Sequence, residues 1–138
     1  MAQVITKHDG GMAFSANIDG HTITLDSHPE FGGSDSGPQP KPLLLLSLSG
    51  CTGMDVVSLL KKMRVEYADF QITVDAELTD EHPRYYQKIN LTYSIRTKPE
   101  YHNKVNKAVD LSQERYCGVS YMLSKSAELT YGINFLEL

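Results

Sequence analysis

The chain has 138 residues, of which 41% are hydrophobic, and a formal charge of −4 at pH 7. This size fits one domain over residues 1–138 with a modest core, and the acidic balance excludes the basic footprint typical of nucleic-acid-binding proteins. The first seven residues hold no apolar stretch suited to a signal peptide, and the longest apolar run is too short to cross a bilayer. We therefore expect a cytoplasmic protein that binds neither nucleic acid nor membrane.

Alternating apolar residues predict β-strands between residues 4 and 26. The Asp-Gly pair at 19–20 is typical of a tight hairpin turn, and the Asp-Gly-Gly sequence at 9–11 indicates an earlier turn. Residues 27–42 are rich in Gly, Pro and Ser and have no periodicity, which predicts a loop. Ordered loops of this length in small domains are often functional.

A long helix is predicted from Pro42 to Met63, because Pro42 is well placed for a first helical turn. Leucines at 43–46 would lie on every face of this helix, and small residues dominate from 47 to 53. This composition indicates that the helix is buried on nearly all sides. One short chain has too few other segments to cover every face of it. A second subunit would supply such segments, so we expect a homodimer.

The remaining pattern predicts two strands, two helices and a final strand. In chain order these are strands at 67–78 and 86–95, helices at 101–115 and 119–124, and a strand at 128–135. Strands and helices do not alternate regularly along the chain. The order therefore favours an α+β fold with antiparallel sheets.

The chain has two cysteines, Cys51 and Cys117, which are 66 positions apart and form neither a CxxC motif nor a zinc-binding spacing. A lone cysteine is most often a small core residue, and a permanent disulfide is disfavoured in the cytoplasm. However, Cys117 is close to Arg115 and precedes a short helix, which favours a thiolate. Two such thiols suit redox chemistry, in which one attacks a peroxide and the other resolves the product. No cofactor or metal is expected, since the histidines are also scattered.

Three sequence blocks resemble the OsmC/Ohr family (osmotically inducible protein C and organic hydroperoxide resistance protein), in particular its OsmC-like redox branch. The blocks are Gly32 to Pro40, Leu43 to Leu46 with Ser49 to Leu60, and Tyr116 to Ser120 with Met122 and Leu123. The order of elements agrees along essentially the whole chain. The resemblance implies an OsmC-like fold, in which an intertwined homodimer buries two central helices between curved antiparallel sheets and forms two active sites at the subunit interface.

The resemblance also implies the activity of a thiol peroxidase in oxidative stress defence. In such a protein Cys51 would attack an organic hydroperoxide, or hydrogen peroxide, and Cys117 would resolve the product through a disulfide that an external thiol reductant resets. The leucine-rich surroundings favour a peroxide with an apolar tail. Two features depart from the family pattern: Pro42 occupies the position of the family's glutamate, and no arginine precedes Arg64, where the family uses an N-terminal arginine.

These departures keep two alternatives open. One is a non-catalytic or oxidant-sensing member that binds a small apolar molecule at the dimer interface, and the other is a structural dimer with inert thiols. Lys7 lies in the region of the missing arginine and His28 borders the glycine-rich loop, but solvation is the favoured role for both. Asp55 follows Cys51 by one helical turn, so it would raise the pKa of that thiol, and we expect it to form a hydrogen bond near a helix or subunit contact.

Overall fold

The computed structural model describes all residues from Met1 to Leu138. The chain folds into two compact units, Met1–Leu46 and Ser47–Leu138, and each is described here by itself. The expectation of a single domain over residues 1–138 stays a prediction.

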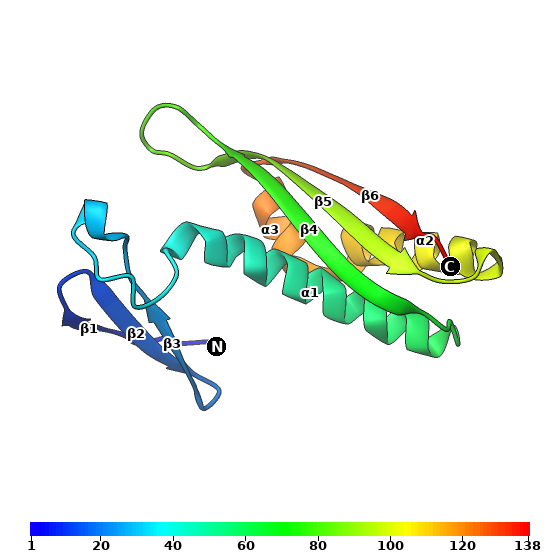
Figure 1. Ribbon diagram of the computed structural model, residues 1–138, viewed down its shortest axis with the longest axis horizontal. Helices are drawn as coiled ribbons and strands as arrows, with labels where there is room; N and C mark the ends of the chain where they lie inside the picture. Colours follow the sequence, from blue (N-terminus) through cyan, green and yellow to red (C-terminus); the bar gives the residue numbers. More distant parts are fainter. The chain divides into compact units, whose positions relative to one another are not determined.

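The first unit contains a three-stranded antiparallel sheet in the order β1-β2-β3, which Figure 1 shows in blue. Its strands are β1 (Thr6–Gly10), β2 (Ala13–Ile18) and β3 (His21–Leu25). Both predicted turns are present, and Asp19 and Gly20 have positive φ angles of 52° and 82°, as a tight hairpin turn requires. The prediction of β-strands joined by two turns in this region is confirmed, and the three strands form a meander.

The glycine-rich loop that follows β3 is organised around one buried carboxylate, that of Asp26, which is 3% exposed. This carboxylate accepts hydrogen bonds from the backbone N–H groups of Ser27, Ser34 and Ser36 and from the Ser36 hydroxyl. These donors, above all the hydroxyl of Ser36, lower the pKa of Asp26 to about 2. The loop is tightly packed, because a Cβ on Gly33 would lie 1.9 Å from the carbonyl oxygen of Ser27.

The long helix α1 (Pro40–Lys62) begins two residues earlier than predicted. Its buried residues are spaced four apart and form one stripe: Leu48, Thr52, Val56 and Leu60. Other apolar side chains of the helix remain exposed, Met54 by 77% and Val57 by 41%. Burial on nearly all sides is therefore not present in the single chain, where only one face of α1 is covered.

By length and composition alone, α1 is apolar enough to cross a membrane. This is weak evidence for a membrane helix, because the core helix of a soluble protein passes the same test. Here the buried stripe of α1 packs against a sheet, as the hydrogen bond between Thr52 and Tyr93 shows. One face of α1 therefore belongs to the core of the second unit.

The second unit is built on a sheet with the strand order β4-β5-β6. Strands β4 (Ala68–Leu78) and β5 (Tyr86–Arg96) are antiparallel, whereas β6 (Glu128–Leu136) runs parallel to β5 along its whole length. The expectation of antiparallel sheets is thus wrong for this last pair. The two strands are parallel because the segment that connects them is long. The chain leaves β5, passes through two helices and returns in the same direction, as parallel strands require.

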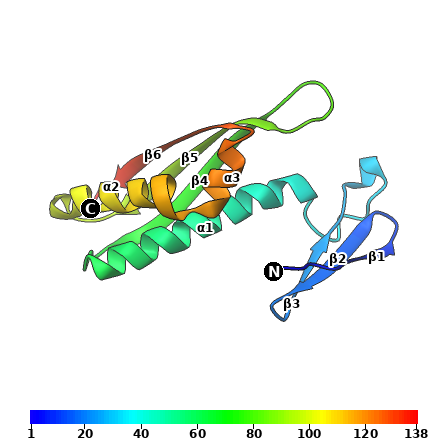
Figure 2. The same ribbon diagram turned by 180° about the vertical axis from the view of Figure 1, so that it is seen from behind.

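The helices of the second unit lie on one face of this sheet (Figures 1 and 2). The buried side chains of β5 alternate along the strand, and they meet buried residues of α1 and of α2 (His102–Leu111). The sheet and α2 contribute Ile89, Leu91, Tyr93, Ile95, Val105, Ala108 and Val109 to this core. The inward face of α2 consists of Val105, Ala108 and Val109, whereas Leu111 is only half-buried.

The predicted helix over 101–115 is interrupted, and the interruption bears on the site. The α-helical part ends at Leu111, and a wide turn of π type spans Ser112–Tyr116. The turn is closed by the N–H of Cys117, which donates to the carbonyl oxygen of Ser112 at 2.7 Å. Helix α3 (Gly118–Ser124) then starts directly after Cys117. Turns of this type occur frequently at functional sites.

Candidate functional site

The two cysteines, although 66 residues apart, lie side by side in the second unit. The Sγ atoms of Cys51 and Cys117 and a carboxylate oxygen of Asp55 all lie within 4.8 Å of one another. Both thiols are free; Cys51 is half-buried and Cys117 is 3% exposed. We call these three residues the dithiol cluster.

Local structure explains the position of Cys117. It is the N-cap residue of α3, and its Sγ accepts a hydrogen bond from the N–H of Ser120 at 3.4 Å. Cys51 comes from the middle of α1, and its sulfur accepts a hydrogen bond from the N–H of Val119. The first turn of α3 therefore directs one backbone N–H at each sulfur.

The electrostatics of the cluster favour a neutral thiol at Cys51. Burial raises the pKa of the Cys51 thiol, and the neighbouring Cys117 and the Asp55 carboxylate raise it further. The hydrogen bond from Val119 acts in the opposite direction but does not outweigh them. The expected influence of Asp55 on the thiol is confirmed, although burial is the larger cause.

A chain of hydrogen bonds links the cluster to the core. Thr52 Oγ1 lies 2.6 Å from the hydroxyl of Tyr93 and 2.7 Å from Ser112 Oγ. Ser112 Oγ donates to Asp55 Oδ2 at 3.1 Å, and Gln113 Nε2 donates to the Tyr93 oxygen at 2.6 Å. The bond between Ser112 and Asp55 joins two helical segments, as expected for this carboxylate.

The donor and the acceptor of each hydrogen bond in this network follow from the groups at its two ends. An ionised carboxylate only accepts, so Ser112 donates to Asp55 and must accept from Thr52. Thr52 then accepts from Tyr93, whose oxygen accepts from Gln113. Because Thr52 and Ser112 are fully buried and every hydroxyl has a partner, the chain holds Asp55 in place as a carboxylate beside both sulfurs.

Two surface hollows flank the dithiol cluster. One, of about 390 Å³, is lined by Cys117 together with Arg115, Ser120 and Tyr121. The other, of about 310 Å³, is lined by Asp55 and by Ser58, Leu59, Lys62 and Tyr116. Tyr116 also lines the first hollow, so the two hollows share this side chain.

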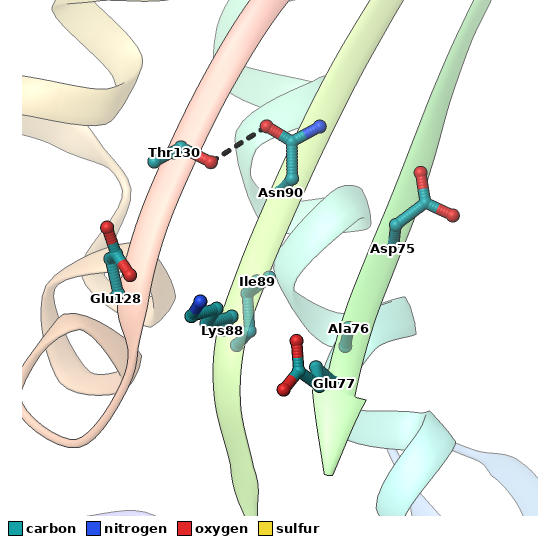
Figure 3. A pocket seen from close by; sticks show the side chains of 8 residues that line it. All are labelled: Asp75, Ala76, Glu77, Lys88, Ile89, Asn90, Glu128 and Thr130. Carbon is teal, nitrogen blue, oxygen red and sulfur yellow. Dashed lines mark hydrogen bonds between the residues drawn. The ribbon is translucent and has the colours of Figure 1, made fainter.

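A slightly larger hollow, of about 410 Å³, lies over the sheet of the second unit (Figure 3). Its polar lining consists of cross-strand neighbours, with Lys88 paired in register with Glu77 on one side and Glu128 on the other. Thr130 donates a hydrogen bond to Asn90 at 2.8 Å, drawn as a dashed line in Figure 3. Charges that compensate each other on an exposed sheet face need no ligand, so we place no site there.

The other residues considered from the sequence lie outside the dithiol cluster. Lys7 is an exposed residue of β1, and Nδ1 of His28 lies 3.7 Å from a carboxylate oxygen of exposed Asp35. Pro42 lies in the first turn of α1. Sequence reasoning missed the buried polar chain Thr52, Tyr93, Ser112 and Gln113, whose only signal was polar residues within apolar segments.

Comparisons with known proteins agree with this architecture. A model of the OsmC-like protein family matches residues 33–132, which include all three residues of the dithiol cluster. The chain is 34% identical over 130 residues to Protein YhfA of Escherichia coli K12, with 94% of each chain covered.

Among solved structures, a hypothetical protein from Aquifex aeolicus VF5 has a TM-score of 0.81 and 27% identity, with 99% of this chain and 98% of that chain covered. An organic hydroperoxide resistance protein OsmC from Legionella pneumophila has a TM-score of 0.66 and 15% identity, with 97% and 98% covered. At that identity the second match supports the fold alone.

Proposed function

Because the chain belongs to the OsmC-like protein family, we propose that it is a thiol peroxidase that reduces organic hydroperoxides in oxidative stress defence. One observation carries the proposal: two free thiols lie within reach of each other, and one of them, Cys117, lines a surface hollow. A family that includes an organic hydroperoxide resistance protein, from Legionella pneumophila, agrees with this chemistry.

In the proposed reaction Cys51 is the attacking thiol and Cys117 the resolving one. The Cys51 sulfur attacks one peroxide oxygen and breaks the O–O bond, so that the thiol becomes a sulfenic acid and the hydroperoxide leaves as an alcohol. The Cys117 thiol then attacks the sulfenic sulfur and releases water as the disulfide forms. Two external thiols restore the pair and become a disulfide themselves, which balances the two electrons.

The fraction of Cys51 that is ionised determines the rate of the first step. The thiolate is the nucleophile, and the raised pKa of Cys51 keeps most of the protein in the thiol form at neutral pH. We therefore expect the rate of peroxide reduction to rise about tenfold per pH unit from pH 7 into the alkaline range, where the thiol ionises.

We further propose that the working form is a homodimer located in the cytoplasm. The supporting observation is apolar surface in the second unit, where Met54, Tyr121 and Met122 are each exposed by more than 60%. Large exposed apolar side chains are expected where a second subunit packs. Sedimentation at low micromolar concentration should give twice the mass of the chain, and Met54→Glu should shift the equilibrium toward the monomer.

The direct test is reduction of an alkyl hydroperoxide by the full chain with a dithiol reductant. Wild type should turn over, Cys51→Ser should lose all activity, and Cys117→Ser, treated with the peroxide before any reductant is added, should react once and stop as a sulfenic acid. Ser126→Ala, which changes an exposed side chain outside the cluster, is the matched control and should behave as wild type. Turnover that persists in Cys51→Ser would refute the assignment.

The raised pKa of Cys51 favours one second candidate, a slow oxidant sensor that binds a small apolar molecule at the dimer interface. This protein would form the same disulfide without efficient turnover. It predicts that peroxide oxidises both cysteines completely but that added reductant gives no catalytic cycle. Catalytic turnover at a rate well above that of a free thiol would exclude it.

A further inference from the structure

We propose that the reduced dithiol cluster is a binding site for a thiophilic divalent cation of the Zn²⁺ type, with Cys51, Asp55 and Cys117 as its protein ligands. The sequence spacing does not indicate such a site, because its ligands come from two different helical segments. The proposal goes beyond peroxide reduction and does not require that the protein perform it.

The ligand atoms have suitable identity and spacing. Two thiolates and one carboxylate are typical zinc ligands, and three protein ligands leave a fourth position for water or substrate. Tetrahedral zinc with bonds of about 2.3 Å to sulfur and 2.0 Å to oxygen would place two sulfurs about 3.8 Å apart. The three atoms already lie within 4.8 Å of one another, so closure needs each pair to approach by only about 1.3 Å or less.

Each proposed ligand also has a partner that would form the outer shell of a metal site. Val119 N–H donates to Cys51 Sγ, Ser120 N–H donates to Cys117 Sγ, and the Ser112 hydroxyl donates to Asp55 Oδ2. Such outer-shell bonds orient ligands and tune the affinity of metal sites. The bond from Ser112 to Oδ2 leaves the carboxylate of Asp55 with free lone pairs for a metal.

The charge of the cluster calls for a cation. The three groups carry three negative charges when deprotonated, and Asp55 forms no ion pair, since the ion pairs of the chain are His28–Asp35 and Arg96–Asp69. A divalent ion would neutralise two of these charges and stabilise both thiolates, which the burial of Cys51 otherwise disfavours. The hollow lined by Asp55 gives the ion an entry path.

Metal binding and disulfide formation would exclude each other. When a hydroperoxide oxidises the two metal-bound thiolates, two protons are taken up, the disulfide and the free cation are released, and the peroxide becomes an alcohol and water. The oxidised protein offers only Asp55 and should not retain the ion.

Titration of the reduced full chain with Co²⁺ under anaerobic conditions tests the proposal. We expect one ion per chain, thiolate-to-cobalt charge-transfer absorption, and the intense visible bands of tetrahedral cobalt, with Zn²⁺ displacing the probe. Cys51→Ser and Cys117→Ser should each weaken or abolish the charge-transfer band. Asp55→Asn should weaken binding more than tenfold, and Ser112→Ala, which leaves all ligands, by about tenfold.

Asp75→Asn, on the exposed face of β4, is the matched control and should bind as wild type. Absence of the charge-transfer band would overturn the proposal. Unchanged affinity in Asp55→Asn would also overturn it, because the two thiols alone would then bind the ion. Addition of one equivalent of hydroperoxide separates this proposal from peroxide reduction. If the chain binds Co²⁺ but the metal-free protein forms no disulfide with the same peroxide, the metal site stands and the peroxidase proposal fails.

Discussion

Two acidic centres of this chain, the Asp26 carboxylate and the dithiol cluster, have pKa shifts in opposite directions. Asp26 in the first unit is almost fully buried but accepts four hydrogen bonds, and its pKa is lowered to about 2. Cys51 in the second unit has one backbone donor and two acidic neighbours, and its pKa is raised. Hydrogen-bond donors are the main cause at Asp26, whereas burial is the main cause at Cys51.

The comparison assigns different roles to the two sequence blocks that look most specific. The block at 32–40 contains donors that fix Asp26 in its ionised form, which makes the loop a structural element. The block at 49–60 brings acidic groups together with few donors, which leaves them available for a proton, an oxidant or a metal ion. Substitutions in the loop block should therefore change mainly the stability of the protein, and those beside Cys51 should change mainly the reactivity of its thiol.

The largest effect is expected for Gly33→Ala in the loop. A Cβ at this position would overlap the Ser27 backbone, which cannot move without breaking the hydrogen bonds around Asp26. We expect a loss of about 3 kcal/mol or more in the free energy of unfolding, measured by urea denaturation. Gly50→Ala, where a Cβ would meet nothing within 4 Å, is the control and should be neutral or stabilising.

Thr52→Val should come next, because it leaves buried polar partners unsatisfied. The hydroxyl of Thr52 links Tyr93 to Ser112, so its loss should lower the free energy of unfolding by about 2 to 3 kcal/mol. Thr130→Val, at an exposed hydrogen bond of β6, should cost less than about 0.5 kcal/mol. Equal costs in both variants would contradict the role of the buried chain.

Asp26→Asn should give a smaller, pH-dependent loss. Because the folded-state pKa of Asp26 lies below the value of an unfolded aspartate, its contribution to stability is present above about pH 4 and lost as the pH falls through about 2. Thermal unfolding should show the variant several degrees less stable at pH 7, with the difference closing between pH 4 and pH 2. A difference independent of pH would contradict the account.

The smallest effect is expected for Asp55→Asn on the reactivity of Cys51. Removal of this negative charge lowers the pKa of the thiol and increases the thiolate fraction at pH 7. Because burial is the largest cause and the Asp55 carboxylate a minor one, we expect only a small increase in the alkylation rate. The rate against pH for wild type and variant measures it, and slower alkylation in the variant would argue against the electrostatic reading.

Periodicity predicted most of the fold, because local patterns report strands and helices directly. The strand meander, the helix α1 and the strands β4 and β5 all lie close to their expected positions. The parallel direction of β6 and the break after Leu111 were missed, since both depend on how distant segments pack.

The candidate site was predicted only in outline. The pairing of Cys51 with Cys117 came from family resemblance, because no local pattern reports contacts between distant residues. The wide turn that sets Ser112 against Thr52 left no sequence signal at all, and the same holds for the outer-shell donors of α3.

The central claim is that the two cysteines form one redox pair, and one equivalent of an alkyl hydroperoxide tests it most directly. Intact-protein mass and thiol counting should show the loss of two hydrogen atoms and two thiols, and peptide mapping should identify a Cys51–Cys117 link that a dithiol reverses. A Cys51 oxidised to sulfinic acid beside a free Cys117, or two thiols untouched by the peroxide, would contradict the claim.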